Sequence, residues 1–107
     1  MSTKKSCRID EVRIHEDGRL LVVPDPAKSP DYQWIYRAAL EVTWDADLAS
    51  LATPPPRTGS YCDRFEFVLR ASKEEYGVAL FLDEQTRWVD VSDGDRAEFE
   101  ARAASAV

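Results

Sequence analysis

The side chains in this sequence best suited to binding are its aromatic rings and its arginines. Three tryptophans in 107 residues is a high content, and arginines lie near them in the chain. Tryptophan and arginine are enriched at the energetic centres of protein interfaces because they combine a large contact area with directed hydrogen bonds. The more common alternative is that such rings form the core of a small sheet domain. The candidate binding residues are Trp34, Arg37, Trp44, Arg57 and Trp88.

Carboxylates crowd the last quarter of the chain and are the second group that could do chemistry. Seven of them stand against three arginines between Asp83 and Arg102. Carboxylates serve as general acids and bases and bind Mg²⁺ or Ca²⁺. Their spacing lacks the Asp-x-Asp-x-Asp-Gly pattern of a calcium loop, however. A solvated acidic face, with Asp93 and Asp95 complementing a helix N-terminus, is the simpler interpretation.

Other common chemistries lack the residues that they need. His15 is the single histidine, which excludes multi-histidine metal sites and makes nucleophile–histidine pairs improbable. The four glycines are isolated, whereas a phosphate-binding loop needs several together. Cys7 and Cys62 have no histidine neighbours, so we expect two reduced, partly buried thiols and no zinc. We therefore predict no catalytic residue, no metal site and no cofactor.

Charge and hydropathy limit the partners and the location. The formal net charge is −6 and the pI is about 4.7, which disfavours a general nucleic-acid binder. The basic start of the chain is not followed by an apolar signal region, and no apolar run approaches the roughly 20 residues that span a bilayer. We expect a cytoplasmic protein with neither nucleic-acid nor membrane partners.

The elements that must position these side chains begin with a β-hairpin over Cys7–Pro24. Apolar and polar residues alternate in its first arm, the apolar run Leu20–Val23 forms the return arm, and Gly18 lies in the connecting turn. Ile9 is out of phase with the apolar residues that follow it, which indicates a bulge near Asp10–Glu11. Three prolines make residues 24–31 a loop.

Residues 34–44 fit both helical and strand spacing. Their β-branched and aromatic residues favour a strand, and that is our prediction. A turn at Asp45–Asp47 then leads into a shorter partner strand over Leu48–Ala52. The triple proline at Pro54–Pro56 ends that strand.

The clearest helix spans residues 60–76. Ser60 is a good N-cap, an apolar stripe recurs at helical spacing, and Gly77 suits a left-handed C-terminal cap. The continuous apolar run Val78–Leu82 predicts a strand buried on both faces.

The chain then turns into a short strand and a last helix. Arg87–Val91 alternates apolar and polar residues. Ser92 or Asp93 can cap the helix that follows, over Asp95–Ala103, and Phe99 is its main apolar contact.

Together these elements predict an α+β fold. We expect a single, largely antiparallel sheet of four to five strands, with the long helix and the short C-terminal helix packed on one face. We expect residues 1–107 to form one domain, with disordered tails at 1–6 and 104–107.

Several short motifs resemble those of short bacterial proteins, some of them carried on integron gene cassettes. The resemblance covers residues 7–99 and rests on Tyr36-Arg37-Ala38-Ala39, Val42, Trp44-Asp45, Pro54-Pro55-Pro56, Tyr61, Glu75-Tyr76-Gly77-Val78 and Trp88-Val89. It implies an α+β single domain with no assigned activity. No functional residue carries over from it.

Three functions fit these observations. The favoured one is a non-enzymatic binding or interaction module that self-associates as a homodimer through a sheet edge or an aromatic patch, or that binds another protein. The first alternative is a small-molecule binder or small enzyme that uses carboxylates, with Arg37 or Arg57 as an anion clamp. The second is an acidic antagonist of another protein, of the immunity or nucleic-acid-mimic type.

Overall fold

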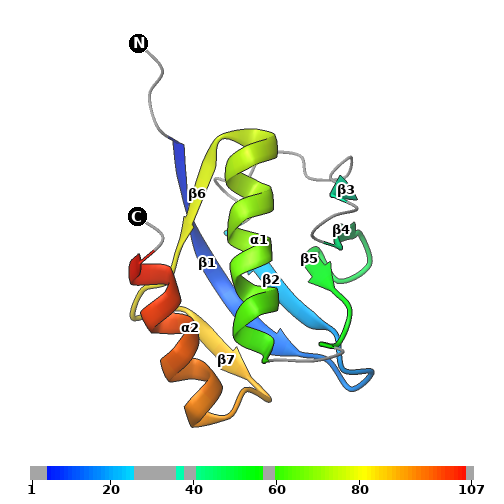
Figure 1. Cartoon of the computed structure of the whole chain (residues 1–107), viewed down its shortest axis with the longest axis vertical. Coiled ribbons are helices and arrows are strands. Elements are labelled where there is room, and N and C mark those ends of the chain that lie inside the picture. The colour runs from blue at the N-terminus through cyan, green and yellow to red at the C-terminus, as the bar shows by residue number, and fades with distance from the viewer. Residues whose placement is uncertain (1–4, 26–35, 38–40, 57–59, 106–107) are drawn as a thin grey trace.

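The structure, a computed structural model, describes residues 5–25, 36–37, 41–56 and 60–105 (Figure 1). Within these ranges strands and helices occur together in one packed unit, which confirms the predicted α+β class. The elements are β1 (Lys5–Ile14), β2 (Leu20–Pro24), β3 (Tyr36–Arg37), β4 (Val42–Asp45), β5 (Ser50–Thr53), α1 (Tyr61–Tyr76), β6 (Val78–Phe81), β7 (Arg87–Val89) and α2 (Asp93–Ser105).

The strands form one sheet that is largely antiparallel, as predicted, but it has more strands than the four to five expected and two of its pairs are parallel. Seven strands take part, in the order β3-β4-β5-β2-β1-β6, and β7 also pairs with β1. The pairs from β3 to β1 are antiparallel, but β6 and β7 lie parallel to β1. The reason is that α1 crosses the sheet from β5 to its opposite edge, and a crossover of this kind returns the chain parallel rather than antiparallel.

The predicted hairpin is confirmed as β1 and β2. Their register shifts between Ile9 and Glu11, which confirms the expected bulge. Gly18 in the turn has a φ of 92°, a conformation that glycine adopts readily. Its carbonyl oxygen accepts a hydrogen bond of 2.7 Å from the Tyr61 hydroxyl in the first turn of α1. The hairpin turn is therefore tied to the start of the long helix.

The single strand predicted over residues 34–44 is wrong, because two strands that pair with each other occupy that region. Tyr36 of β3 is opposite Thr43 of β4 in an antiparallel pair. Glu41, just before β4, takes a positive φ of 56°. This reversal carries no glycine or proline signal, so the sequence pattern reads as continuous. Residues 34–35 and 38–40 lie outside the described part of the chain.

Both helices occupy the predicted regions with changed ends. Gly77 ends α1 in the left-handed conformation, and its N–H donates to the Lys73 carbonyl at 2.9 Å. The Ser60 hydroxyl makes no cap hydrogen bond, contrary to the prediction. The Ser92 hydroxyl does cap α2, accepting from the Asp95 N–H at 3.1 Å.

Two expected boundaries move because their residues are held by regular structure. The tail predicted at residues 1–6 is too long, because Lys5 and Ser6 pair with β6. The tail predicted at 104–107 is likewise too long, because α2 continues to Ser105. In contrast, the strand predicted over 87–91 ends at Val89, before Asp90 with its φ of 57°.

The core lies between the sheet and the two helices, with α1 lying across the sheet (Figure 1). Phe99 of α2 is fully buried and stacks on Phe65 of α1 with 4.8 Å between ring centroids. Phe99 is thus the main apolar contact of α2, as predicted. Cys7 and Cys62 are buried as thiols in the same core.

Candidate interaction surface

Strand β6 is the element that presents an apolar side chain to solvent at a sheet edge. It pairs with β1 on one side, and no strand in the described residues pairs with its other side. Val78 and Leu80 are buried, whereas Ala79 and Phe81 face outward. Phe81 is 42% exposed and is the one exposed large hydrophobic residue in the described part of the chain. The prediction that this strand is buried on both faces is therefore wrong.

The segment after β6 leaves the ladder and rejoins it as β7. Arg8 pairs with Phe81 and Glu11 pairs with Arg87, so two residues of β1 face five residues of the other segment. Thr86, which is buried, fills the break. Its hydroxyl donates to the Ile9 carbonyl at 2.7 Å and accepts from the Asp83 N–H at 3.1 Å. One side chain thus replaces the missing backbone hydrogen bonds.

Charged residues surround this break in the ladder. Asp10 accepts hydrogen bonds from Arg8 at 2.8 Å and from Arg87 at 3.2 Å. Arg8 also lies 3.6 Å from Asp83. The hydrogen bond from Arg8 lowers the pKa of Asp10 below its ordinary value of 3.8. Asp10 is therefore held ionised, as suits an ion-pairing group and not a general acid.

The turn of the hairpin carries a matching set of ion pairs. The Arg19 side chain donates to Asp17 at 2.8 Å and to Asp45 at 3.0 Å. The backbone N–H of Arg19 is the main cause that lowers the pKa of Asp17, and the Arg19 side chain is the main cause for Asp45. The resolved pKa shifts of carboxylates in the described residues are thus all downward.

Trp88 of β7 fixes the position of α2 beside this edge. Its ring stacks near Phe99 at a centroid distance of 6.2 Å. The guanidinium of Arg96 lies over the Trp88 ring, 5.1 Å from its centroid. This distance is within the range of a cation–π interaction. The indole therefore links the exposed side of α2 to the buried aromatic pair.

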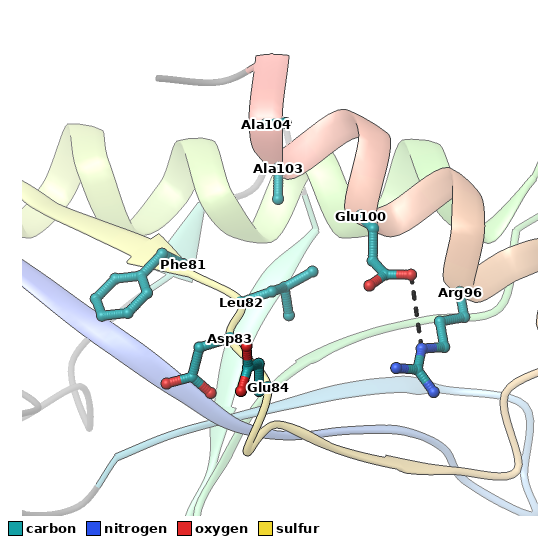
Figure 2. Close-up of a pocket in the computed structure, with 8 residues that line it drawn as sticks. All are labelled: Phe81, Leu82, Asp83, Glu84, Arg96, Glu100, Ala103 and Ala104. Atoms are coloured by element: carbon teal, nitrogen blue, oxygen red, sulfur yellow. Dashed lines mark ion pairs between the residues drawn. The ribbon is translucent and has the colours of Figure 1, made fainter.

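A groove of about 500 Å³ lies between the end of β6 and α2 (Figure 2). We call it the β6–α2 groove. Its apolar wall comes from Phe81, Leu82 and two alanines of α2, and its charged rim is mainly acidic. Arg96 on the rim is 3.6 Å from Glu100. The full lining is Phe81, Leu82, Asp83, Glu84, Arg96, Glu100, Ala103 and Ala104.

A second hollow, of about 200 Å³, lies at the other end of β6 against α1. We call it the α1–β6 hollow. It has an apolar floor and two basic residues, Arg70 and Lys73. The carboxylate of Glu66 at its margin accepts a hydrogen bond of 2.6 Å from Arg102. The full lining is Glu66, Leu69, Arg70, Lys73, Ala79 and Leu80.

A third, shallower pocket lies between the two helices around Cys62 and offers no reactive group. Its lining is Cys62, Glu66, Glu98, Ala101 and Arg102. Burial raises the pKa of the Cys62 thiol above its ordinary value of 9.0. The thiol donates to the Glu98 carbonyl at 3.6 Å. Because the thiolate is the nucleophilic form, a raised pKa makes Cys62 inert near neutral pH.

The structure brings few of the predicted binding residues together. Trp44 and Trp88 are both half-buried and pack against the core, but β5, β2 and β1 lie between their strands. Arg37 belongs to β3, while its side chain, like Trp34 and Arg57, lies outside the described part. The residues that sequence reasoning missed are Phe81 and the charged residues at both ends of β6. Their only sequence signal was an apolar run followed directly by Asp83 and Glu84.

Clustered metal-binding side chains and membrane-length apolar helices are both absent from the described ranges. No group of three or more His, Cys, Asp or Glu side chains there is arranged to hold a metal ion. None of the helices in those ranges is long and apolar enough to cross a membrane.

Comparison with known proteins identifies the family. The family model described as Integron Cassette Protein Hfx_Cass5 matches residues 8–86. A solved structure of the integron cassette protein Hfx_Cass5, from the mobile metagenome of the North West Arm sewage outfall, is 35% identical in sequence, with 97% of this chain and 98% of that chain covered and a TM-score of 0.42. No curated protein matches significantly. Since the family model matches well over half of the chain, as the motifs over residues 7–99 led us to expect, the protein belongs to the Hfx_Cass5 family of integron cassette proteins.

Proposed function

We propose that this protein is a non-enzymatic interaction module that self-associates as a homodimer through the outer edge of β6. The observation that carries the proposal is an uncharged strand, Val78–Phe81, at the end of the sheet order, with Phe81 exposed. Natural proteins usually protect such an edge with lysine, proline or a bulge. This strand contains none of these, so the backbone groups of its outer edge, which no strand of the described residues pairs with, favour pairing with another strand.

Addition of a strand would satisfy those backbone groups and remove Phe81 from water at the same time. The Val78 carbonyl already accepts a hydrogen bond of 3.1 Å from the Ser72 hydroxyl. The part of β6 best suited to a new partner is therefore Ala79–Phe81. Burial of the phenyl ring contributes to the association free energy in proportion to the apolar area covered.

Trp88 contacts α2, which lies next to the outer edge of β6. Through Arg96 and Phe99 it places α2 as one wall of the β6–α2 groove. A binding role for Trp34, Arg37, Trp44 and Arg57 stays a prediction, as does the location of the protein in the cytoplasm.

The two alternative functions have less support. A carboxylate enzyme needs an acid with a pKa raised toward neutrality, whereas arginine partners lower the pKa of Asp10, Asp17 and Asp45. An acidic antagonist needs one contiguous acidic face. Arginines are instead paired with carboxylates at both the hairpin turn and the break in the ladder.

Sedimentation velocity over micromolar to millimolar concentrations tests the proposal. The wild-type protein is expected to shift from 12.1 kDa toward twice that mass. The variant Phe81→Lys places a charge on the edge and is expected to stay monomeric. Ala97→Lys, at an exposed position of α2 outside the groove lining, adds the same charge and should associate as the wild type does. A wild-type protein that stays at 12.1 kDa at millimolar concentration would overturn the proposal.

A further inference from the structure

We infer that the two copies pair through antiparallel β6 strands related by a two-fold axis, so that the α1–β6 hollow of each copy faces the β6–α2 groove of the other. This inference rests on the proposed function and specifies the partner and its orientation. It follows from a difference in charge between the two ends of the strand.

The lining of the α1–β6 hollow is net basic and that of the β6–α2 groove is net acidic. Part of the basic charge is offset, because Arg70 lies 3.7 Å from Glu74 and Glu66 also lines the hollow. Arg70 and Lys73 line the α1–β6 hollow beside Ala79 and Leu80. At the other end Asp83, Glu84 and Glu100 line the β6–α2 groove together with a single arginine, Arg96. Arg96 offsets Glu100 at 3.6 Å and Arg8 lies 3.6 Å from Asp83, so Glu84 is the carboxylate of this lining that has no arginine partner among the described residues. A strand that is basic at one end and acidic at the other is complementary to itself only when reversed.

Reversal is what a two-fold axis normal to the sheet produces. It joins two edges antiparallel, keeps the helices of both copies on the same face, and places the basic end of one copy beside the acidic end of the other. Both contacts form twice in the dimer. A parallel arrangement would instead place basic beside basic and acidic beside acidic, which is repulsive.

The side-chain alternation of β6 agrees with this arrangement. Residues directly opposite in an antiparallel pair lie on the same face. Among the registers that keep Val78 and Leu80 on the helix side, we favour those that bring Phe81 beside Ala79 or Gly77 of the partner subunit over the one that brings it beside Phe81 of the partner subunit. Ala79 and Gly77 are both small and exposed, which leaves space for the phenyl ring. The helix-side face of β6, formed by Val78 and Leu80, then lies beside the same face of the partner subunit.

Charge reversal tests the orientation. The first variant, Arg70→Glu with Lys73→Glu, makes both ends of β6 acidic. The second, Glu84→Lys with Glu100→Lys, makes both ends basic and leaves Asp83 to its contacts with Gln85 and Arg8. Each variant alone is expected to self-associate at least about tenfold more weakly than the wild type, because both of its contacts become repulsive. An equimolar mixture should form heterodimers with nearly wild-type affinity, since attraction is restored at both contacts.

The mixture also controls for misfolding, because a variant that fails to fold cannot be rescued by its partner. Native mass spectrometry separates the homodimers from the heterodimer, and sedimentation gives the affinities. If each variant alone associates like the wild type, or if the mixture associates no better than its components, the antiparallel orientation is wrong. A third outcome separates the two proposals: the wild type associates, Phe81→Lys does not, and the mixture is not rescued. Pairing through β6 would then be supported, and only the antiparallel orientation would be wrong. A monomeric wild type would overturn both.

Discussion

Strand β1 is flanked by two very different neighbours, and the comparison bears on both the stability of this protein and its proposed interaction surface. On one side β2 follows through a tight turn and pairs from Leu20 to Pro24 in one antiparallel ladder with a single bulge. On the other side two short parallel strands, β6 and β7, share β1 between them, with a break at residues 82–86. We call these the hairpin flank and the broken flank.

The hairpin flank is stabilised locally and is covered, because β5 continues the sheet beyond β2. The broken flank is built from segments more than 60 residues away in sequence and ends at β6. It depends on tertiary contacts: the hydroxyl of Thr86 in the ladder and the ring of Phe99 in the core. The flank built from distant segments is thus also the one whose outer strand no other described strand pairs with.

The largest expected effect of a substitution on this comparison comes from Phe99→Ala. The ring is fully buried and joins α2 to Phe65. Its removal leaves a cavity, and the free energy of unfolding should fall by about 3–5 kcal/mol. Urea denaturation measures this. The same change at the exposed ring, Phe81→Ala, should cost less than about 1 kcal/mol. Equal losses at the two positions would contradict the burial that distinguishes them.

On the hairpin flank Gly18→Ala should cost about 1–3 kcal/mol. The positive φ of 92° is unfavourable for alanine, and a Cβ there would approach the Cγ atom of Pro55 to 3.0 Å. Thermal or urea denaturation gives the loss. Gly94→Ala is the matched control, because nothing lies within 4 Å of that position in α2. It should not destabilise the protein and gains up to about 1 kcal/mol from helix propensity. A neutral Gly18→Ala would show that the turn adjusts freely.

On the broken flank Thr86→Val should cost about 1–2 kcal/mol, because the Ile9 carbonyl and the Asp83 N–H both lose a buried partner. Valine keeps the shape of threonine, so the change isolates the hydroxyl. Thr86→Ser retains the hydroxyl and should lose less. Hydrogen exchange of the Asp83 amide should also accelerate in Thr86→Val. Unchanged exchange and stability would show that the break is held by the surrounding ion pairs instead.

The smallest expected effect is acid destabilisation, which involves both flanks. The folded-state pKa of Asp10 on the broken flank and of Asp17 and Asp45 on the hairpin flank lies below the ordinary value of 3.8. The unfolded state therefore binds more protons in that range. The stability from these groups is fully present above about pH 4 and is lost as the pH falls through the lowered pKa values.

Denaturation between about pH 6 and pH 2 measures this loss. Because these carboxylates are all partly exposed, solvent screens their ion pairs and the slope should be shallow. Asp10→Asn should reduce the part of this pH dependence that comes from the broken flank, and Asp45→Asn should reduce the part that comes from the hairpin flank. Stability that rises as the pH falls below 4 would contradict the ion pairs described at both places.

The features predicted correctly from the sequence lie mainly on the hairpin flank and at the end of α1. The β1–β2 hairpin, its bulge at Asp10–Glu11 and the end of α1 at Gly77 were all predicted, because alternation, phase and glycine are signals carried by neighbouring residues. The reversal between β3 and β4 was missed because Glu41 takes a positive φ of 56° with no glycine or proline to mark it. The binding role of residues chosen by type, such as Trp44 and Trp88, stays a prediction, and both are half-buried against the core.

The sequence by itself determined the α+β class, the hairpin, the two helices and the burial of Phe99, since each depends on the spacing of apolar residues within a short window. Only the tertiary structure decided that β6 and β7 lie parallel to β1. That pairing depends on where α1 carries the chain, which no local pattern encodes. It also decided that β6 ends the strand order of the described sheet, with Phe81 exposed. The residues of the apolar run Val78–Leu82 would suit a strand with one neighbour as well as a strand with two. The exposure of this run therefore depends on how the rest of the chain pairs in the sheet.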